Sequence, residues 1–288
     1  MCRLVGIVAS EVSEFGLVLK EAPRSLARLS REHPDGWGVA AHGDPEAMPP
    51  PSTRSPHENG WRIHKGTRPA GECDRFHQVA ARSVGNVLVA HVRQKTIGPT
   101  RIENTHPFVQ SGWVFAHNGT LKDYEWIREA ISIERRAQLR GDTDSEVLFA
   151  YVLTHLDTAG VTLTTAADPA ARAEATRVLD HVAAEMRARQ AGAFNFLLSD
   201  GASLFVHRFG RSLFLLERGP SDPIRTERDI DSSASLETPW TKRRHAALIA
   251  SERLTDEPWR ELPEGTFLRI DLRPKPTIIA VNAPDRAA

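Results

Sequence analysis

The chain has 288 residues, of which 40% are hydrophobic, so it can form one large domain or two ordinary ones with a sizeable core. Lysine plus arginine and aspartate plus glutamate both number 37, so no net charge favours binding to nucleic acid or to an anionic membrane. Cys2 and Cys73 give neither metal-ligand spacing nor a disulfide framework, and no apolar run approaches the length of a membrane span. We therefore expect a cytoplasmic protein with no cofactor or metal, whose partner is a small neutral or zwitterionic molecule.

Ten short apolar runs, separated by turn residues, have the length and the Val, Ile and Phe content of strands with one or both faces covered. In chain order they are CRLVGIVA, GWGVAAHG, NVLVAHVRQ, WVFAHNG, FNFLLSDG, SLFVHRFG, SLFLLER, HAALIAS, TFLRIDL and TIIAV. Three stretches have helical spacing, Phe15–Arg31, Asp144–Leu156 and Pro169–Gln190. Asp168 is the predicted N-cap of the last, with Pro169 at its first helical position.

Few helices and many strands, arranged in blocks, predict an α+β layered fold. Two polar segments, at about 43–75 and 219–245, are predicted to be excursions from it. The first contains the run GDPEAMPPPSTRSP, and proline prevents regular strand pairing. With neither an internal repeat nor a domain linker in the sequence, we expect a single domain over residues 2–288.

Cys2 stands at the start of the first apolar run and has two interpretations. Free cysteines are among the most buried residue types, so Cys2 can be a small apolar residue at a strand end. Alternatively, removal of Met1, which a small second residue permits, leaves a thiol and a free α-amine on Cys2. A nucleophile and a base then share one residue. Position alone favours the packing interpretation.

Three further polar clusters follow apolar runs, and each also has two interpretations. Arg93 can pair with a structural carboxylate or bind a substrate carboxylate, because a guanidinium fits a carboxylate as a bidentate partner. Asn118-Gly119 is a favoured turn pair, but the Asn amide and the Gly backbone N–H can also form an oxyanion hole. The pair Thr143-Asp144 can cap a helix, or Asp144 can bind a substrate ammonium group.

With the thiol of Cys2, these clusters supply what an enzyme needs to attack the side-chain amide of glutamine. The motifs MCRLVGIVA, HPDGWGVA, AHVRQKT, ENTHPF, FAHNGTL and GDTDSEVLF occur in this order. In this order and spacing they resemble the class II glutamine amidotransferases, whose domain is an N-terminal nucleophile hydrolase. Downstream, FNFLLSDG and ALIASERLTDEPWRELPEGTFLRI resemble the stand-alone branch of that family, so the resemblance covers nearly the whole chain.

The resemblance implies a four-layer αββα sandwich with two stacked antiparallel sheets covered by helices. It also implies that Cys2 is the nucleophile after loss of Met1, with its own α-amine as the general base. Asn118 and Gly119 would form the oxyanion hole.

For the substrate, the resemblance implies that Arg93 binds the glutamine α-carboxylate, that Asp144 binds the α-ammonium group, and that Thr96 lies near the substrate. The chain differs from synthase-linked members at Ile97, where His is frequent, and at Gln94, where Trp is common. These differences put coupling to an acceptor domain in doubt.

We therefore predict a stand-alone glutaminase or amidotransferase-type hydrolase that releases ammonia and glutamate from glutamine through a γ-glutamyl thioester. Its partners would be glutamine or a γ-glutamyl amide and a separate ammonia-accepting subunit. One alternative is an amidohydrolase of a γ-glutamyl conjugate, as in ergothioneine biosynthesis. The other is a non-catalytic module that binds glutamine or acts as a scaffold.

Overall fold

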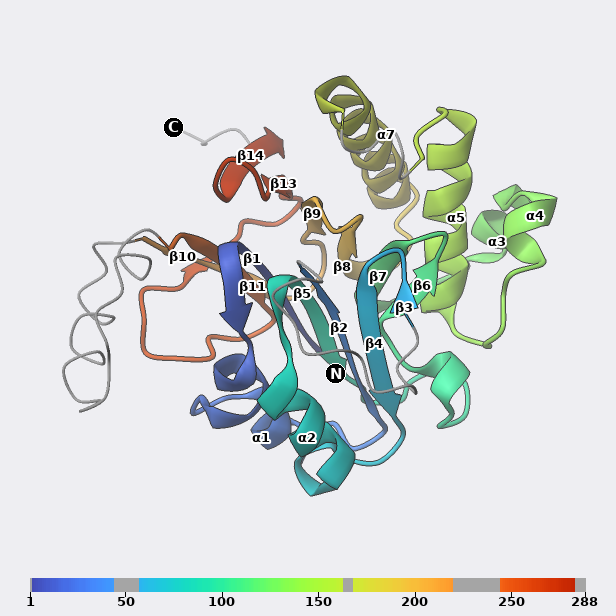
Figure 1. Cartoon of the computed structure of the whole chain (residues 1–288). Coiled ribbons are helices and arrows are strands. Elements are labelled where there is room, and N and C mark those ends of the chain that lie inside the picture. The colour runs from blue at the N-terminus through green and yellow to red at the C-terminus, as the bar shows by residue number, and fades with distance from the viewer. Residues whose placement is uncertain (1, 44–56, 163–167, 220–243, 283–288) are drawn as a thin grey trace, which may run out of the picture.

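The computed structural model describes residues 2–43, 57–162, 168–219 and 244–282, which form two stacked antiparallel sheets with helices on both outer faces (Figure 1). The prediction of an α+β sandwich with the αββα layer order is confirmed.

The first sheet has eight strands in the order β12-β10-β11-β1-β5-β2-β4-β3. In chain order the bounds are β1 Arg3–Glu14, β2 Trp37–His42, β3 His57–Glu58, β4 Trp61–Gly66, β5 Val84–Val92, β10 Phe214–Arg218, β11 Ala246–Ala250 and β12 Arg260–Glu261. β1 pairs with β11 at Val5↔Ala250 and with β5 at Arg3↔Val92. Because both pairings are antiparallel, the start of β1 lies beside the ends of β5 and β11 at one edge of the sheet.

The second sheet has six strands in the order β14-β13-β9-β8-β7-β6. Their bounds are β6 Phe108–Gln110, β7 Trp113–Leu121, β8 Gly192–Ser199, β9 Ser203–His207, β13 Phe267–Asp271 and β14 Thr277–Asn282. β7 pairs with β8 over its whole length, from Val114↔Ser199 to Leu121↔Gly192.

The helical elements are divided between the two outer layers. Their bounds are η1 Leu17–Glu21, α1 Leu26–Leu29, η3 Ala70–Glu72, α2 Asp74–Arg82, η4 Ile102–Asn104, α3 Glu125–Ala130, α4 Ile133–Arg136, α5 Asp144–Thr158 and α7 Pro169–Ala188. Figure 1 shows α1 and α2 below the first sheet and α5 and α7 beside β7 and β8 of the second.

The apolar stretch 4–9 of β1 is covered on both faces. Leu4 and Val8 lie in the core between the two sheets, whereas Val5 and Ile7 lie in the core between the first sheet and its helices. Successive residues of a strand point to opposite faces, so a strand covered on both sides is apolar throughout. Position 6 of the same strand is a glycine, and a Cβ there would lie 2.9 Å from the side chains of Leu197 and Leu204 in the second sheet.

All ten predicted strands are present, and four others, β3, β4, β6 and β12, were not predicted. The predicted helix over Phe15–Arg31 is wrong as a single element: the stretch forms the π-helical turn η1 and the four-residue helix α1. Pro23 lies between the two, and proline lacks the N–H that a continuous helix needs. The other two helices are confirmed as α5 and α7, and Asp168 caps α7 by accepting from the Ala171 backbone N–H at 3.3 Å.

The predicted excursion at 43–75 needs correction in its second half. Residues 57–75 include β3, β4, η3 and the start of α2, and β4 pairs with β2 from Trp37↔Gly66 to His42↔Trp61. The alternating burial of β4 places Trp61 and Ile63 in the core between the sheets. Residues 44–56, and nearly all of the second predicted excursion at 219–245, lie outside the described residues.

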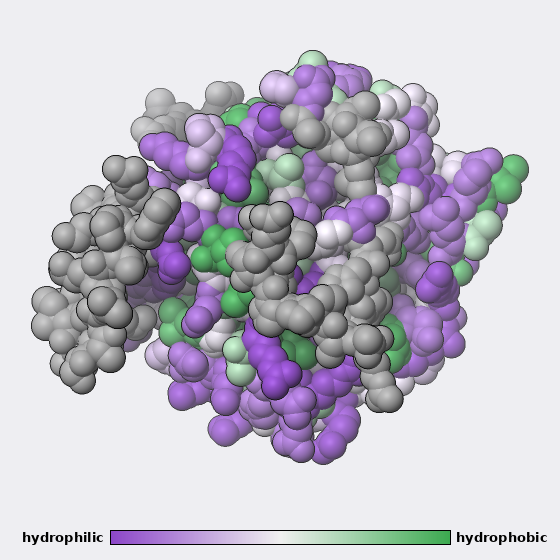
Figure 2. Space-filling view, viewed as in Figure 1, coloured by the Kyte–Doolittle hydropathy of each residue, from purple (hydrophilic) through white to green (hydrophobic). Residues whose placement is uncertain are grey.

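Within the described residues, no helix is both long and apolar enough to span a bilayer. Figure 2 shows a largely hydrophilic face, with a hydrophobic projection over α4, where Ile133 is 83% exposed.

Candidate active site

Cys2 lies directly before β1, at the edge where β5 and β11 end. Its Sγ donates to the backbone oxygen of Gln94 and accepts from the Gln94 backbone N–H, both at 3.3 Å. Gln94 follows Arg93 at the end of β5. The pairing of β1 with β5 therefore brings the thiol beside the arginine that sequence analysis selected.

The Cys2 thiol is protonated in this environment. Burial raises its pKa above the ordinary value, and the nearby Asp144 carboxylate raises it further, while the Gln94 backbone and the charge of Arg93 act in the opposite direction. The net shift is upward, so the thiol needs a base before it can act as a nucleophile.

Arg93 is buried, and its guanidinium holds the loop that follows β5. It donates to the backbone oxygens of Ile97 at 2.9 Å, Gly98 at 3.3 Å and Pro99 at 3.1 Å. No carboxylate of the described residues forms an ion pair with it, so the structural ion pair considered for Arg93 is not found there. A guanidinium has five N–H donors, so the three loop oxygens do not use all of them.

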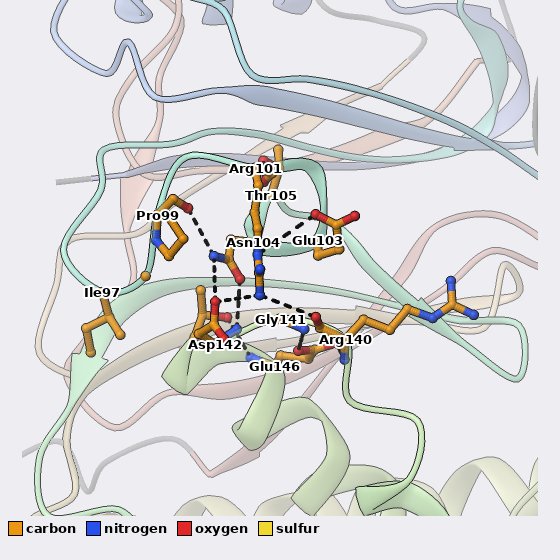
Figure 3. A network of polar contacts seen from close by, with 12 residues as sticks. Ile97, Pro99, Arg101, Glu103, Asn104, Thr105, Arg140, Gly141, Asp142 and Glu146 are labelled. Carbon is orange, nitrogen blue, oxygen red and sulfur yellow. Dashed lines mark hydrogen bonds and ion pairs between the residues drawn. The ribbon is translucent and has the colours of Figure 1, made fainter.

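Asn104 and Asp142 fasten this loop to the segment before α5 (Figure 3). Asn104 accepts from the Asp142 backbone N–H at 2.9 Å and donates to the Pro99 oxygen at 3.0 Å. Arg101 donates to the Asp142 carboxylate at 2.5 Å. The motifs ENTHPF and GDTDSEVLF are thus one unit in space. Asn104 and Asp142 were not predicted to be functional residues, although both lie in these motifs.

Glu146, in the first turn of α5, holds the other end of the same segment. Its carboxylate accepts from the backbone N–H groups of Arg140 at 2.9 Å and Gly141 at 2.6 Å (Figure 3). Thr143 is the N-cap of α5, since its Oγ1 accepts from the Glu146 backbone N–H at 3.2 Å. The predicted capping role therefore belongs to Thr143.

Asp144 joins the start of α5 to the end of β7. Its carboxylate accepts from the backbone N–H groups of Leu121 at 2.8 Å and Ser145 at 2.9 Å, and the residue is 3% exposed. Ser145 Oγ in turn lies 2.8 Å from Nδ1 of His117 on β7. These contacts hold Asp144 close enough for its charge to act on the Cys2 thiol.

Asn118 projects from β7 toward the first sheet. Its Nδ2 donates to Ser251 Oγ at 3.3 Å, and the same oxygen accepts from the Leu4 backbone N–H at 3.1 Å. Leu4 is two residues from Cys2, so Ser251 ties the Asn118 amide to the strand that carries the thiol. Ser251 directly follows β11. It lies in the quoted stretches HAALIAS and ALIASERLTDEPWRELPEGTFLRI, but it was not predicted to be a site residue.

The turn interpretation of Asn118-Gly119 is wrong, because both residues lie within β7 and pair with Asn195 and Phe194 of β8. Glycine at 119 has a packing reason of its own: a Cβ there would lie 1.8 Å from the backbone oxygen of Ala193. No residue with a side chain fits at this position unless β8 moves.

Thr96 is the last of the predicted site residues. Thr96 is exposed on the loop that Arg93 holds.

His91 and His106 are buried with ring centroids 4.3 Å apart, and burial lowers the pKa of His91 to about 3 and that of His106 well below its ordinary value. Both rings are neutral at physiological pH. No group of His, Cys, Asp and Glu residues in the described ranges is arranged to hold a metal ion.

Comparison with known proteins shows the family and the fold of the chain. Residues 1–273 match the family model described as class II glutamine amidotransferases. The chain is 27% identical over 283 residues to the putative glutamine amidotransferase YafJ of Escherichia coli K12, covering 93% of this chain and 96% of that protein.

It is also 28% identical over 252 residues to the gamma-glutamyl-hercynylcysteine sulfoxide hydrolase of Mycobacterium tuberculosis H37Rv, covering 83% of this chain and 90% of that one. Among solved structures, a crystal structure described as a "predicted glutamine amidotransferase" from Pseudomonas aeruginosa has the same fold. Its TM-score is 0.59 at 23% identity, and the match covers 97% of this chain and 99% of that one.

Proposed function

This chain belongs to the class II glutamine amidotransferase family, and from that premise we propose that it hydrolyses the side-chain amide of glutamine through Cys2. Arg93 binds the substrate α-carboxylate and Asp144 binds the α-ammonium group, with Thr96 nearby. Ammonia and glutamate are the products.

In the first step of the proposed reaction, the α-amine of Cys2, freed by loss of Met1, takes the proton from Sγ. An α-amine has an ordinary pKa of about 7.7 to 8.0, so an appreciable fraction is free base near neutral pH. Sγ then attacks the δ-carbon of glutamine, and the resulting oxyanion accepts hydrogen bonds from Asn118 Nδ2 and the Gly119 N–H.

In the second step the carbon–nitrogen bond breaks, and the nitrogen leaves as ammonia with the proton that the α-amine had taken. Water attacks the γ-glutamyl thioester, giving up one proton to the α-amine, which returns it to Sγ as glutamate leaves. The ammonia passes to solvent or to a separate accepting subunit.

One observation supports this proposal above the others. The thiol of Cys2 contacts the backbone of Gln94, next to Arg93, and lies within the electrostatic reach of both Arg93 and Asp144. A nucleophile with one cationic and one anionic side chain near it suits a substrate that carries an α-carboxylate and an α-ammonium group.

The test is a covalent one. Intact-mass measurement should show that Met1 is absent, and an alkylating γ-glutamyl analogue should modify Cys2 and abolish glutamate release. Cys73→Ala is the matched control, because Cys73 is the second free thiol. This variant should leave both the labelling of Cys2 and the turnover unchanged. Retention of Met1 on active protein, or modification of Cys73 alone, would overturn the mechanism.

A second candidate is hydrolysis of a γ-glutamyl conjugate other than glutamine. It is favoured by the similarity to the gamma-glutamyl-hercynylcysteine sulfoxide hydrolase over most of both chains. Glutamate release from a panel of γ-glutamyl amides separates the two: activity on a conjugate with none on glutamine selects this one. Binding of glutamine without any turnover would instead select the non-catalytic module.

A further inference from the structure

A cavity of about 400 Å³ opens beside Asn118. Ser251 and Arg3 also line it, so it begins at the residues that hold the Asn118 amide and at the residue after Cys2. Its other lining residues come from the segments at β10, β11 and β12 and, at Arg24, from the segment between η1 and α1.

The strand order places this cavity on one side of the thiol and Arg93 on the other. In the first sheet, β11 and β5 are the two neighbours of β1. Arg93 follows β5, Cys2 precedes β1, and Ser251 follows β11, all at the same edge. A substrate whose glutamyl end is bound at Arg93 and whose δ-carbon is at Cys2 therefore directs its leaving group toward the cavity.

The cavity is rich in arginine. Four arginines and two glutamates line it, namely Arg3, Arg24, Arg211, Arg253, Glu252 and Glu261. Both acids already have cationic partners: Glu252 pairs with Arg3, and Glu261 lies 3.7 Å from Arg208, which is outside the cavity lining.

Arg24, Arg211 and Arg253 have no carboxylate partner among the described residues. Arg211 lines the cavity, and its Nε is buried without a hydrogen-bond partner among the described residues. The guanidinium of Arg253 lies 5.5 Å from the centroid of the Phe214 ring, and Asp256, which lines an adjoining hollow with Arg24 and Arg253, forms no ion pair with either. A buried donor without a partner is costly, and an anionic ligand removes that cost.

We propose that this cavity binds the leaving group, and that the preferred substrates are γ-glutamyl amides whose leaving amine carries a carboxylate, as in a γ-glutamyl amino acid. This inference rests on the proposed function, since it presumes attack at a γ-glutamyl amide by Cys2. Ammonia neither fills a cavity of this size nor needs cationic side chains around it, whereas cavities of this volume are typical of small-molecule sites.

The experiment compares two substrates that differ only in charge, γ-glutamylglycine and γ-glutamylglycinamide. We expect kcat/KM to be about 10- to 100-fold higher for the carboxylate, the range that corresponds to a hydrogen bond to a charged group. Arg211→Gln and Arg253→Gln should each lower that ratio several-fold, and the double variant by about tenfold or more. Arg253→Lys should keep more of the ratio than Arg253→Gln does.

Arg260→Gln is the matched control. Arg260 lies on β12, is exposed, and does not line the cavity; its nearest acid is Glu217 at 3.9 Å. This variant should leave the ratio as it is in the unaltered protein.

The outcomes distinguish the two proposals. Hydrolysis of both amides at equal kcat/KM, or a preference that survives the double variant, would overturn the leaving-group site and leave the proposed function standing. No glutamate from glutamine or from either amide, together with no alkylation of Cys2, would overturn both.

Discussion

The side-chain amide of Asn118 donates to Ser251 Oγ at 3.3 Å, which links β7 of one sheet to the end of β11 in the other. Ser251 is 4% exposed and also accepts from the Leu4 backbone, on the strand that begins after Cys2. The orientation of the proposed oxyanion-hole amide thus depends on the packing of the two sheets at this edge.

Asn118→Ala should lower kcat by about 100- to 1,000-fold, the range found when one oxyanion-hole donor is removed from other enzymes. Steady-state glutamate release gives the rate, and a thermal unfolding curve shows whether the fold survives. Full turnover in a folded variant would exclude Asn118 from the oxyanion hole.

Ser251→Ala should lower kcat by about tenfold with little change in KM, because one transition-state donor loses its orientation while the groups at Arg93 are untouched. The variant also leaves the Leu4 N–H without its partner, which should cost about 1–3 kcal/mol of unfolding free energy. Ser251→Thr keeps the hydroxyl and should restore most of kcat. A loss of stability alone, with kcat unchanged, would mean that Ser251 only joins the strands.

Arg93→Lys should raise KM for glutamine by at least about tenfold. A lysine ammonium has only three N–H donors, all on one nitrogen. It cannot donate to the three loop oxygens and also form two parallel hydrogen bonds to a carboxylate. Initial-rate kinetics over a range of glutamine concentrations give KM. An unchanged KM would show that Arg93 serves the loop and not the substrate.

Asn104→Ala should lower the free energy of unfolding by about 1–3 kcal/mol, because the Asp142 N–H and the Pro99 oxygen both lose a buried partner. KM should rise as well, since Pro99 belongs to the loop that Arg93 holds. Denaturant titration measures the first effect. Thr100→Ala, an exposed change in the same loop, is the control and should stay within about 0.5 kcal/mol of the parent.

The buried His207 predicts acid sensitivity of the fold. Burial lowers its pKa to about 3, below the ordinary value of 6.5. As the pH falls, the unfolded chain takes up the proton on this histidine before the folded protein does. The contribution of His207 to the free energy of unfolding is therefore complete above about pH 6.5. It falls by about 1.4 kcal/mol per pH unit below that, until the native pKa is reached. His207→Gln should flatten the dependence of unfolding free energy on pH between 6.5 and 4 by about that slope. Parallel curves for the two proteins would contradict this account.

The long strands could be predicted from sequence because each carries its signal locally. Residues 4–9 of β1 are apolar without interruption because both faces of the strand are covered there. Such a run can be recognised from sequence without knowledge of the partner strands. The four missed strands are short or polar. The single helix expected over Phe15–Arg31 is interrupted near Pro23, and the proline could have predicted this break from sequence.

By itself, the sequence determined the family, ten of the strands and the candidates Cys2, Arg93, Asn118, Gly119 and Asp144, because residue type and order are properties of the chain. Tertiary structure alone decided what surrounds them. The pairing of Asn104 with Asp142 joins residues 38 positions apart, and the contact of Ser251 with Asn118 joins residues 133 positions apart. The arginine-lined cavity gathers residues from segments as distant as Arg3 and Glu261. Such contacts leave no periodic pattern in the chain, because they depend on how two sheets stack and which strand ends meet at one edge.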